Sequence, residues 1–452
     1  MNEIELLPHS RVRDVFGLAE SAARELGIRD VEVIVAAESS ALTRFANNAI
    51  HQNVAQQVLS VSIRTVRDNR TARATTNRLD AGSIRRAVAQ AAAIMNSVKP
   101  LPYLPRMAGP SPFEEVDRFC TATAAASPAD RARAIAEAIG IAEQASQTAA
   151  GIFSTEQGAH AILNSAGVFA YHAATMARFS VTAMTGDSSG WAKVSAVDRR
   201  EIDTAGFAAR AVEKARLSRN VQKLPPGRYT VVLEPAAVLD LVGQMFGDFS
   251  ATALLDQRSF LTGRMGQRLF GENISIRDDA YHPLQAGPGF DGEGSPRQRL
   301  LLVDAGTPKE VARSRMAAQR DGAPPTGHGF PLPNETGEAP VNIVITGGDV
   351  PVDRMVASLD RGILVTRLWY IREVDPYEKI MTGMTRDGTF LVEGGRIRCG
   401  VRNFRFNQSL IEMLQNVEAL SPSARVSGEE TFDMVVPAMQ VTDFQFTEVT
   451  HF

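Results

Sequence analysis

A short pattern of residues occurs twice in this chain at one fixed offset, and this repetition limits the fold more than any other feature. The first copy is Gly82, Arg86, Ala87, Val88 and Ala91, and the second is Gly206, Arg210, Ala211, Val212 and Ala215. Both copies lie in alanine-rich segments of the kind that form helices. Two alanine-rich helices can match by chance, so the order of the surrounding elements has to separate chance from duplication.

The elements before the two copies follow the same order, a helix and then strands. In the first half, residue spacing predicts a helix at 11–26 and the alanine-rich helix at 80–95. Between them it predicts strand segments at 31–37, 41–46, 49–55 and 59–63, with a turn at Asn47 and Asn48. The second half repeats this order with a helix at 127–146, strand segments at 151–155, 159–164, 168–174 and 177–185, and the second alanine-rich helix at 204–217. We therefore predict two duplicated helix-plus-antiparallel-sheet units.

Proline-rich segments divide the chain. Residues 99–112 contain five prolines, which remove hydrogen-bond donors and stiffen the path, so this segment is predicted to connect units at about 1–98 and 113–222. Pro225 and Pro226 mark the next boundary. A chain of 452 residues is expected to form two domains, here an N-terminal α+β domain at 1–222 and a C-terminal domain at 223–452.

The C-terminal domain is predicted to be mostly β with a few helices. It begins with a strand at 229–233, after which Pro235 opens a helix whose apolar face continues to Phe246. Further strands are expected at 300–303, 341–346, 363–372, 390–392, 396–401 and 432–446, and helices at 307–319 and 350–361. The fold class predicted for the whole chain is α+β.

Two short blocks after the helix at Pro235 and one long block near the C-terminus resemble a known family. They are 259–267 (SFLTGRMGQ), 290–294 (FDGEG) and 362–421. With the strand and helix before them, they are similar to the C-terminal half of the TldD/PmbA family, once called modulators of DNA gyrase. In that family the catalytic subunit carries an H-E-x-x-x-H zinc motif on this helix, and its partner, TldE or PmbA, does not.

This chain departs from the pattern of the catalytic subunit. It has no histidine between Leu233 and Phe260, and its carboxylates there, at 234, 240, 248 and 256, are spread too loosely to form a site. The family's late cysteine ligand is missing too, because Cys399 lies too early, within a predicted hairpin. The resemblance thus implies a TldE- or PmbA-like subunit with no catalytic and no metal-binding residue, and zinc in the partner.

The function implied by the resemblance is divided between two chains. A TldD-like partner bearing the zinc motif would hydrolyse unfolded or leader peptides, and this chain would help to bind and position them. Two other interpretations stay open. One is a stand-alone hydrolase with a rebuilt metal site, and the other is a non-catalytic binding or regulatory protein that forms a homodimer when isolated.

Two loops of the C-terminal domain supply candidate cleft residues. Thr326 and His328 lie in a Thr-Gly-His-Gly segment that resembles one lining the family's cleft, where His328 would touch a peptide or a partner. Asp291 and Glu293 could join His282 or His328 in a rebuilt metal site. The alternatives are an ordinary turn for Asp-Gly-Glu-Gly and a solvent-exposed loop for His328, whose replacement by Ala would then leave folding intact.

Candidate residues for contact with a partner lie on the apolar segment 363–372. They are Arg367, Trp369 and Tyr370, because aromatic residues and arginine are enriched at protein interfaces. A strand in the core of the domain explains the same residues equally well.

Composition narrows the function classes further. A formal net charge of -3 and a pI of about 6.2 argue against a chain that binds nucleic acid electrostatically. No apolar run approaches about 18 residues and the acidic N-terminus lacks a secretory signal, so we expect a cytoplasmic protein without a membrane span. The two cysteines, Cys120 and Cys399, lack the spacing of a disulfide framework or a structural zinc site.

Overall fold

The computed structural model describes residues 7–450, and its N-terminal part is built on one long antiparallel sheet. The strand order is β3-β2-β1-β4-β5-β6. The strands are β1 (Asp30–Ala46), β2 (Ala49–Arg67), β3 (Arg70–Thr76), β4 (Thr148–Asn164), β5 (Phe169–Thr185) and β6 (Ser188–Ala196). The helices are α1 (His9–Glu25), α2 (Ala81–Ser97), α3 (Thr121–Ala124), α4 (Pro128–Gln144), η1 (Arg199–Glu201) and α5 (Thr204–Leu217).

The order helix, three strands, helix occurs twice, as α1-β1-β2-β3-α2 and as α4-β4-β5-β6-α5. β1 of the first set pairs with β4 of the second, so one sheet passes through both. Each set has its own apolar core: Val15, Ile63 and Ile84 are buried between α1, α2 and the sheet, whereas Ile135 and Phe179 are buried beneath α4 and α5. The sheet is thereby held by helices near both of its ends.

The strands of this sheet are much longer than predicted. The segments 31–37 and 41–46 form the single strand β1, and the four segments predicted between 151 and 185 form β4 and β5. Residues 38–40, 56–58 and 156–158, which separate the predicted segments, lie in half-buried or exposed stretches of continuous strand. The turn at Asn47 and Asn48 is confirmed, since both have positive φ (51° and 58°), as a type I′ hairpin turn requires.

The C-terminal part contains a seven-stranded and a six-stranded sheet. The first comprises β7 (Gly227–Leu233), β12 (Arg361–Asp375), β13 (Ile380–Glu393), β14 (Arg396–Gly400), β15 (Phe404–Ser409), β16 (Val417–Leu420) and β19 (Met439–Val449). The second comprises β8 (Ile276–Asp278), β9 (Leu300–Asp304), β10 (Thr307–Pro308), β11 (Ile343–Ile345), β17 (Ala424–Val426) and β18 (Met434–Val436). The helices are α6 (Pro235–Val242), η2 (Gly243–Asp248), α7 (Ala251–Leu255), α8 (Arg315–Asp321), α9 (Val352–Ser358) and α10 (Leu410–Gln415).

The helix predicted at 307–319 is wrong. Thr307 and Pro308 form the short strand β10, and α8 begins only at Arg315, where the Ser314 side chain accepts the N–H of Ala317. Ala312 is buried in an extended segment and donates its N–H to the carbonyl of Phe249, so tertiary pairing replaces the helical bond. The helix that begins at Pro235 and the hairpin between β13 and β14 are confirmed.

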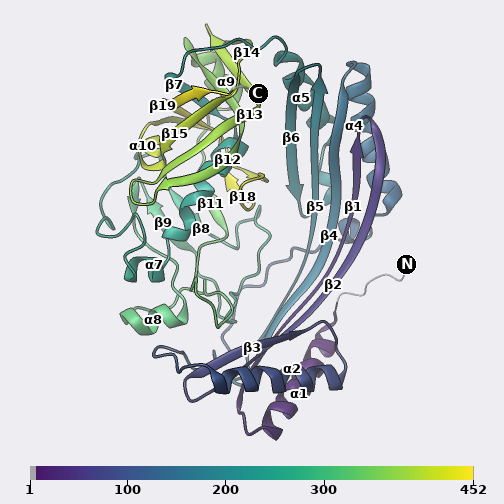
Figure 1. The fold of residues 1–452 in the computed structure, drawn as a ribbon, viewed down its shortest axis with the longest axis vertical. Helices are drawn as coiled ribbons and strands as arrows, with labels where there is room; N and C mark the ends of the chain where they lie inside the picture. Colours follow the sequence, from purple (N-terminus) through teal and green to yellow (C-terminus); the bar gives the residue numbers. More distant parts are fainter. Residues whose placement is uncertain (1–6, 451–452) are drawn as a thin grey trace.

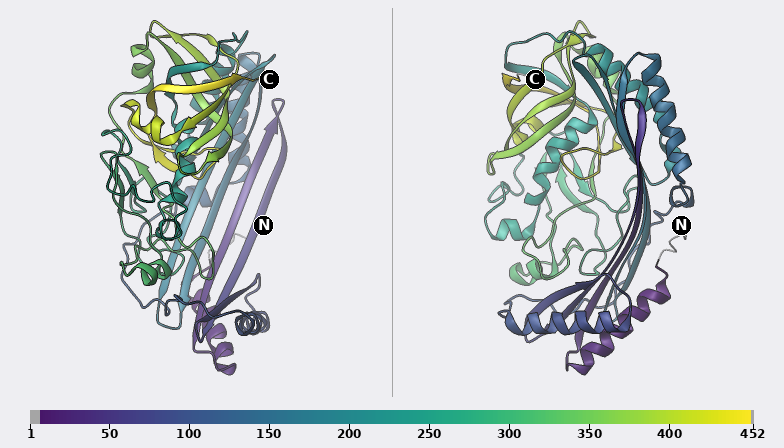
Figure 2. Two further views of the ribbon diagram at one scale, coloured as in Figure 1. Left: turned by 60° about the vertical axis from the view of Figure 1, so that its left-hand side comes forward. Right: turned by 45° about the vertical axis from the view of Figure 1, so that its right-hand side comes forward.

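The C-terminal part packs against the concave side of the long sheet, while α4 and α5 lie on its convex side (Figures 1 and 2). Loops of the C-terminal part reach the middle of the sheet: the Arg118 guanidinium, next to β5, donates to the carbonyl of His282. The fold class is α+β, with a largely β C-terminal part, as predicted. Within residues 7–450, no helix is long and apolar enough to cross a membrane.

Candidate functional site

The predicted cleft residue His328 is paired with Asp278, at the end of β8. Its Nε2 lies 3.1 Å from Asp278 Oδ1, and both side chains are fully buried. Its Nδ1 lies 2.9 Å from the carbonyl oxygen of Thr326 and 3.0 Å from Thr326 Oγ1. Burial alone would raise the pKa of Asp278, but the contact with His328, helped by the charge of Arg297 and the N–H of Asn342, lowers it. The expectation of a solvent-exposed His328 is therefore wrong.

Asp291 holds its own loop together. Its Oδ1 accepts the N–H groups of Glu293 and Ser295, each at 2.9 Å, and its Oδ2 accepts that of Gly329 at 2.8 Å. These bonds join the 290–294 turn to the Thr-Gly-His-Gly loop, so the turn interpretation of Asp-Gly-Glu-Gly describes its geometry. His282 lies apart from this loop pair and accepts the N–H of Leu284 on its own Nδ1.

Glu293 is buried beside Asp291 and is only partly satisfied. Its Oε2 accepts the N–H of Arg315, at the start of α8, whereas its buried Oε1 has no hydrogen-bond partner. Burial, and then the neighbouring Asp291 carboxylate, raise the pKa of Glu293 to about 8. A buried carboxyl in this position favours its neutral form at neutral pH.

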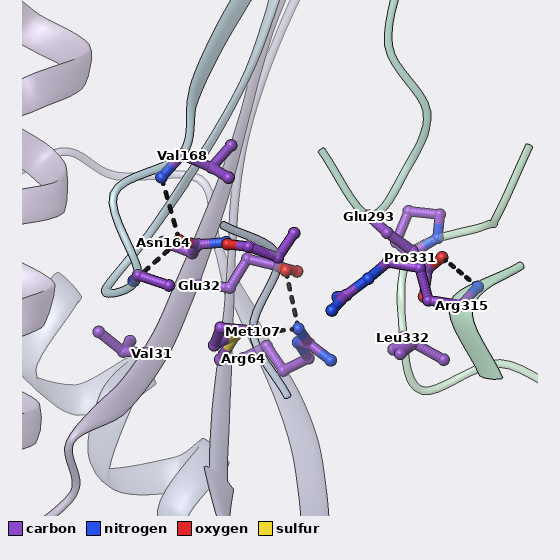
Figure 3. Close-up of polar contacts among 12 residues, drawn as sticks. Val31, Glu32, Arg64, Met107, Asn164, Val168, Glu293, Arg315, Pro331 and Leu332 are labelled. Carbon is purple, nitrogen blue, oxygen red and sulfur yellow. Dashed lines mark hydrogen bonds and ion pairs between the residues drawn. The ribbon is translucent and has the colours of Figure 1, made fainter. Parts of the chain in front are cut away.

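A second charged cluster faces Glu293 from the long sheet. Arg64 on β2 donates from Nη2 to Glu32 on β1 at 2.8 Å, and Arg73 on β3 binds the other oxygen of Glu32. Arg73 also donates to the carbonyl of Leu332, in the C-terminal part. Nε and Nη1 of Arg64 are buried without a partner. Figure 3 shows Arg64 and Glu293 on opposite sides of this boundary.

The interface between the long sheet and the C-terminal part also contains a pocket of about 470 Å³. Its floor is formed by β1, β4 and β5, and its rim includes Arg425 and Asp433. His160 and His172 are cross-strand neighbours on this floor. Burial, and then the proximity of His172, lower the pKa of His160 to about 4, so its imidazole is neutral at neutral pH. A pocket of this size is within the range of small-ligand and peptide side-chain sites.

Sequence reasoning missed this pocket. His160 and His172 were within predicted strands, and the period-two spacing of residues such as Gly158, His160, Ala174 and His172 places them on one face. That spacing can be read from the sequence. It cannot indicate which distant segment covers these histidines. In the structure Phe290, on a loop of the C-terminal part, stacks on His160 with ring centroids 5.8 Å apart.

The helix on which the resemblance placed a zinc motif is α6. Asp240 is its only ionisable side chain and is buried, with Oδ2 3.4 Å from the N–H of Leu368 and Oδ1 3.4 Å from that of Glu430. Burial raises the pKa of Asp240 to about 7, against the effect of those N–H groups. A zinc site needs several converging donors. Asp240 has none beside it, so these residues do not fit zinc.

The other carboxylates near α6 also have separate partners. Glu234 binds Lys214 at 2.6 Å, Asp256 binds Arg320 at 2.7 Å, and Asp248 binds Lys379. Within residues 7–450, no three His, Cys, Asp or Glu side chains are grouped so that they could hold a metal ion.

The three candidates for partner contact differ in exposure. Arg367 is buried, pairs with Asp387 and lies over the ring of Trp191, so it belongs to the boundary between β12 and β6. Trp369 is half-buried, with the guanidinium of Arg386 4.8 Å from its ring centroid. Tyr370 is 54% exposed. Of the three, Tyr370 is the one that is free to meet another molecule.

Comparison with known proteins places nearly the whole chain in one family. Its domain models match residues 31–95 (PmbA/TldA metallopeptidase domain 1), 119–219 (central domain) and 226–448 (C-terminal domain). A metalloprotease of Methanothermobacter thermautotrophicus is 23% identical over 59% of this chain and 60% of its own length. A metalloprotease TldD homolog of Buchnera aphidicola is 24% identical over 50% of this chain and 47% of its own length. These alignments thus span about half to three fifths of the relatives.

Solved structures show the same fold over nearly all of the chain. TldE from Thermococcus kodakarensis superposes with a TM-score of 0.87 at 21% identity, over 96% of this chain and 100% of TldE. A Thermotoga maritima protein described as a modulator of a DNA gyrase gives a TM-score of 0.87 at 20% identity, over the same shares. Together with the three matched domain models, this likeness leads to one conclusion: the chain belongs to the metallopeptidase-related PmbA/TldD family.

Proposed function

We propose that this chain is the subunit without zinc of a TldD/TldE-type heterodimeric metalloprotease. The observation that carries the proposal is the environment of Asp240. It is the only ionisable side chain on α6, and its carboxylate is occupied by backbone N–H groups. A helix of this kind stabilises the domain and offers a single carboxylate in place of the several ligands that a hydrolytic metal needs, so the zinc motif and the hydrolysis belong to a TldD-like partner.

The contribution of this chain to the proposed enzyme is to bind and position unfolded or leader peptides. The pocket of about 470 Å³ supports this role, because it combines neutral imidazoles with the charged side chains Arg178 and Glu156 and with apolar surface. Such a mixture suits a peptide segment, whose backbone needs hydrogen bonds and whose side chains need apolar contacts. In an extended peptide, alternate side chains would enter the pocket.

The contacts of the loop residues favour this proposal over a rebuilt metal site. The Asp291 carboxylate accepts its hydrogen bonds from backbone N–H groups, and His328 is held between Asp278 and Thr326. Both side chains would have to leave these partners to bind a metal. A binding or regulatory homodimer remains the other candidate, since it too needs no metal in this chain.

Co-expression with a TldD-like chain that bears H-E-x-x-x-H tests the proposed division of roles. We expect peptide hydrolysis only by the complex. Ala174→Trp, which fills the pocket from β5, should raise KM for an unfolded peptide while leaving the zinc content of the complex unchanged. Hydrolysis by the isolated chain, or an unchanged KM for the variant, would contradict the proposal.

A further inference from the structure

The pocket between the long sheet and the C-terminal part is lined by one charged side chain that lacks a partner. Its charged side chains are Glu38, Glu156, Arg178, Arg425 and Asp433. Arg178 donates to Glu156 at 3.1 Å. Arg425 donates to Asp433 at 3.0 Å. Within residues 7–450, the Glu38 carboxylate forms no hydrogen bond or ion pair. Because the two histidines of the floor are neutral, the lining carries one uncompensated negative charge.

Glu38 lies on the floor of the pocket, beside two small residues. The register of β1, β4 and β5 puts Glu38 opposite Gly158, and Gly158 opposite Ala174. A Cβ atom on Gly158 would lie 3.9 Å from Glu38 Cγ, so the Glu38 side chain leans toward this glycine. The missing side chain at Gly158 and the methyl group of Ala174 leave room next to the carboxylate for a group of a ligand.

The electrostatic surroundings of Glu38 favour a positively charged group. Burial, and then the charge of Glu156, raise the pKa of Glu38, and the charge of Arg178 opposes them only in part. A carboxyl with a raised pKa has too little positive charge around its ionised form. Arg178 cannot supply more, because its guanidinium lies between Glu156 and Asp433, 3.1 and 3.9 Å away. A cation that enters the pocket would supply the missing charge.

His160 offers a second group to the same ligand. Its imidazole is neutral, and neither ring nitrogen has a hydrogen-bond partner in the described part of the chain. His160 and Glu38 are diagonal neighbours on adjacent strands, a spacing of about 7–8 Å. About two residues of an extended peptide span this distance. A peptide with a positive group at Glu38 would thus bring a backbone amide group to His160.

We propose that Glu38 binds a primary ammonium group of the peptide in this pocket, supplied by the N-terminus or by a lysine side chain. An ammonium group is a compact point charge, so it fits the space beside Gly158 and Ala174 while it bonds to Glu38. The inference rests on the proposed function, because it names the class of peptide that this pocket selects.

KM values of the complex co-expressed with a TldD-like chain test the proposal. The probes are three forms of one octapeptide of Gly, Ala and Ser. The first has a free N-terminus, the second is acetylated, and the third is acetylated and has one Lys in place of an Ala. At least one of the two forms with an ammonium group should have a KM about fivefold below that of the acetylated form without Lys, the effect of one partly exposed ion pair. The form that shows this difference identifies the source of the ammonium group.

Variants of Glu38 separate its effect from preferences of the active site in the partner. Glu38→Gln should raise the KM of the preferred form to that of the acetylated form without Lys, whose own KM should not change. Glu38→Lys should reverse the preference, because it repels an ammonium group. The matched control is Glu143→Gln, at an exposed residue of α4 on the convex side of the sheet (Figure 1), which should keep the wild-type values.

The outcomes separate this inference from the function on which it rests. Equal KM values for the three forms, or a preference that survives both Glu38 variants, would overturn the inference while leaving the proposed function in place. Failure of the complex to hydrolyse any of the three forms would overturn the proposed function and the inference together.

Discussion

His328 Nε2 lies 3.1 Å from Asp278 Oδ1, with both side chains fully buried where the Thr-Gly-His-Gly loop meets the end of β8. Asp278 Oδ2 also accepts the N–H groups of Val341 and Asn342, at 2.6 and 2.9 Å. The pair thus ties three segments of the C-terminal part together at the boundary with the long sheet. A histidine in such a position holds the loop in place, and any contact with a peptide depends on that loop.

Replacing His328 should destabilise the protein. His328→Ala leaves the buried Asp278 carboxylate with the N–H groups of Val341 and Asn342 and the Asn342 side chain as its donors, and losing one member of a buried pair costs about 3–5 kcal/mol. We expect a loss near the lower end, about 3 kcal/mol, because those donors remain. Urea denaturation measures it, with His282→Ala, at a half-exposed histidine, as the matched control. Equal stabilities for the two variants would show that the buried pair contributes nothing.

Glu293 should make stability fall as the pH rises. Its pKa is raised from 4.5 to about 8, so between these values the folded state holds a proton that the unfolded state has lost. The folded state therefore binds more protons, and the free energy of unfolding decreases with pH in this window.

Glu293→Gln should flatten this slope, making the variant more stable than the wild type at pH 8 and nearly equal to it at pH 5. Denaturation across pH 5–8 measures both curves, with the exposed Glu335→Gln as the control that keeps the wild-type slope. Parallel curves for Glu293→Gln and the wild type would contradict the assignment.

Glu32 should matter more for stability than Arg64. Glu32 binds both Arg64 and Arg73, so Glu32→Ala leaves two buried or partly buried guanidinium groups without their carboxylate, at a cost of about 3–5 kcal/mol. Arg64→Ala costs less, because Arg73 still pairs with Glu32 and the two buried nitrogens without a partner, Nε and Nη1, are removed. Thermal and urea denaturation of both variants gives the order. A larger loss of stability for Arg64→Ala than for Glu32→Ala would contradict the predicted order.

Gly329 should tolerate no side chain. A Cβ atom there would lie 2.3 Å from Glu293 Oε2, so the two loops would have to separate. Gly329→Ala is expected to cost about 1–3 kcal/mol, as overpacking of a tight site does. Gly109→Ala is the matched control, because nothing lies within 4 Å of its Cβ position. A melting temperature for Gly329→Ala equal to that of Gly109→Ala would show that the loops are loosely packed.

Much of the fold follows from local patterns. The turn at Asn47 and Asn48 and the helix start at Pro235 both rest on residues adjacent in sequence, and the structure has both. The failures come from tertiary contacts. The segment before α8 has helical spacing, yet Ala312 pairs with Phe249, because a distant backbone offers it a better partner.

The candidate site was harder to predict, for the same reason. Asp291 and Glu293 were identified from their turn, but their burial depends on Gly329 and on the facing sheet. Arg64 follows a strand with alternating apolar residues and resembles an outward-facing polar position. Its face becomes interior only because the C-terminal part covers it, which a period of two cannot indicate.

Metal analysis combined with native mass spectrometry tests the central claim most directly. The protein is captured by a tag from its own cells, and zinc is measured in each species that the spectrum resolves. The account predicts a complex with a second chain of the TldD type, about one zinc per complex, and no stoichiometric zinc in the species made of this chain alone. Stoichiometric zinc in the isolated chain would contradict the proposal that this subunit has no metal site of its own.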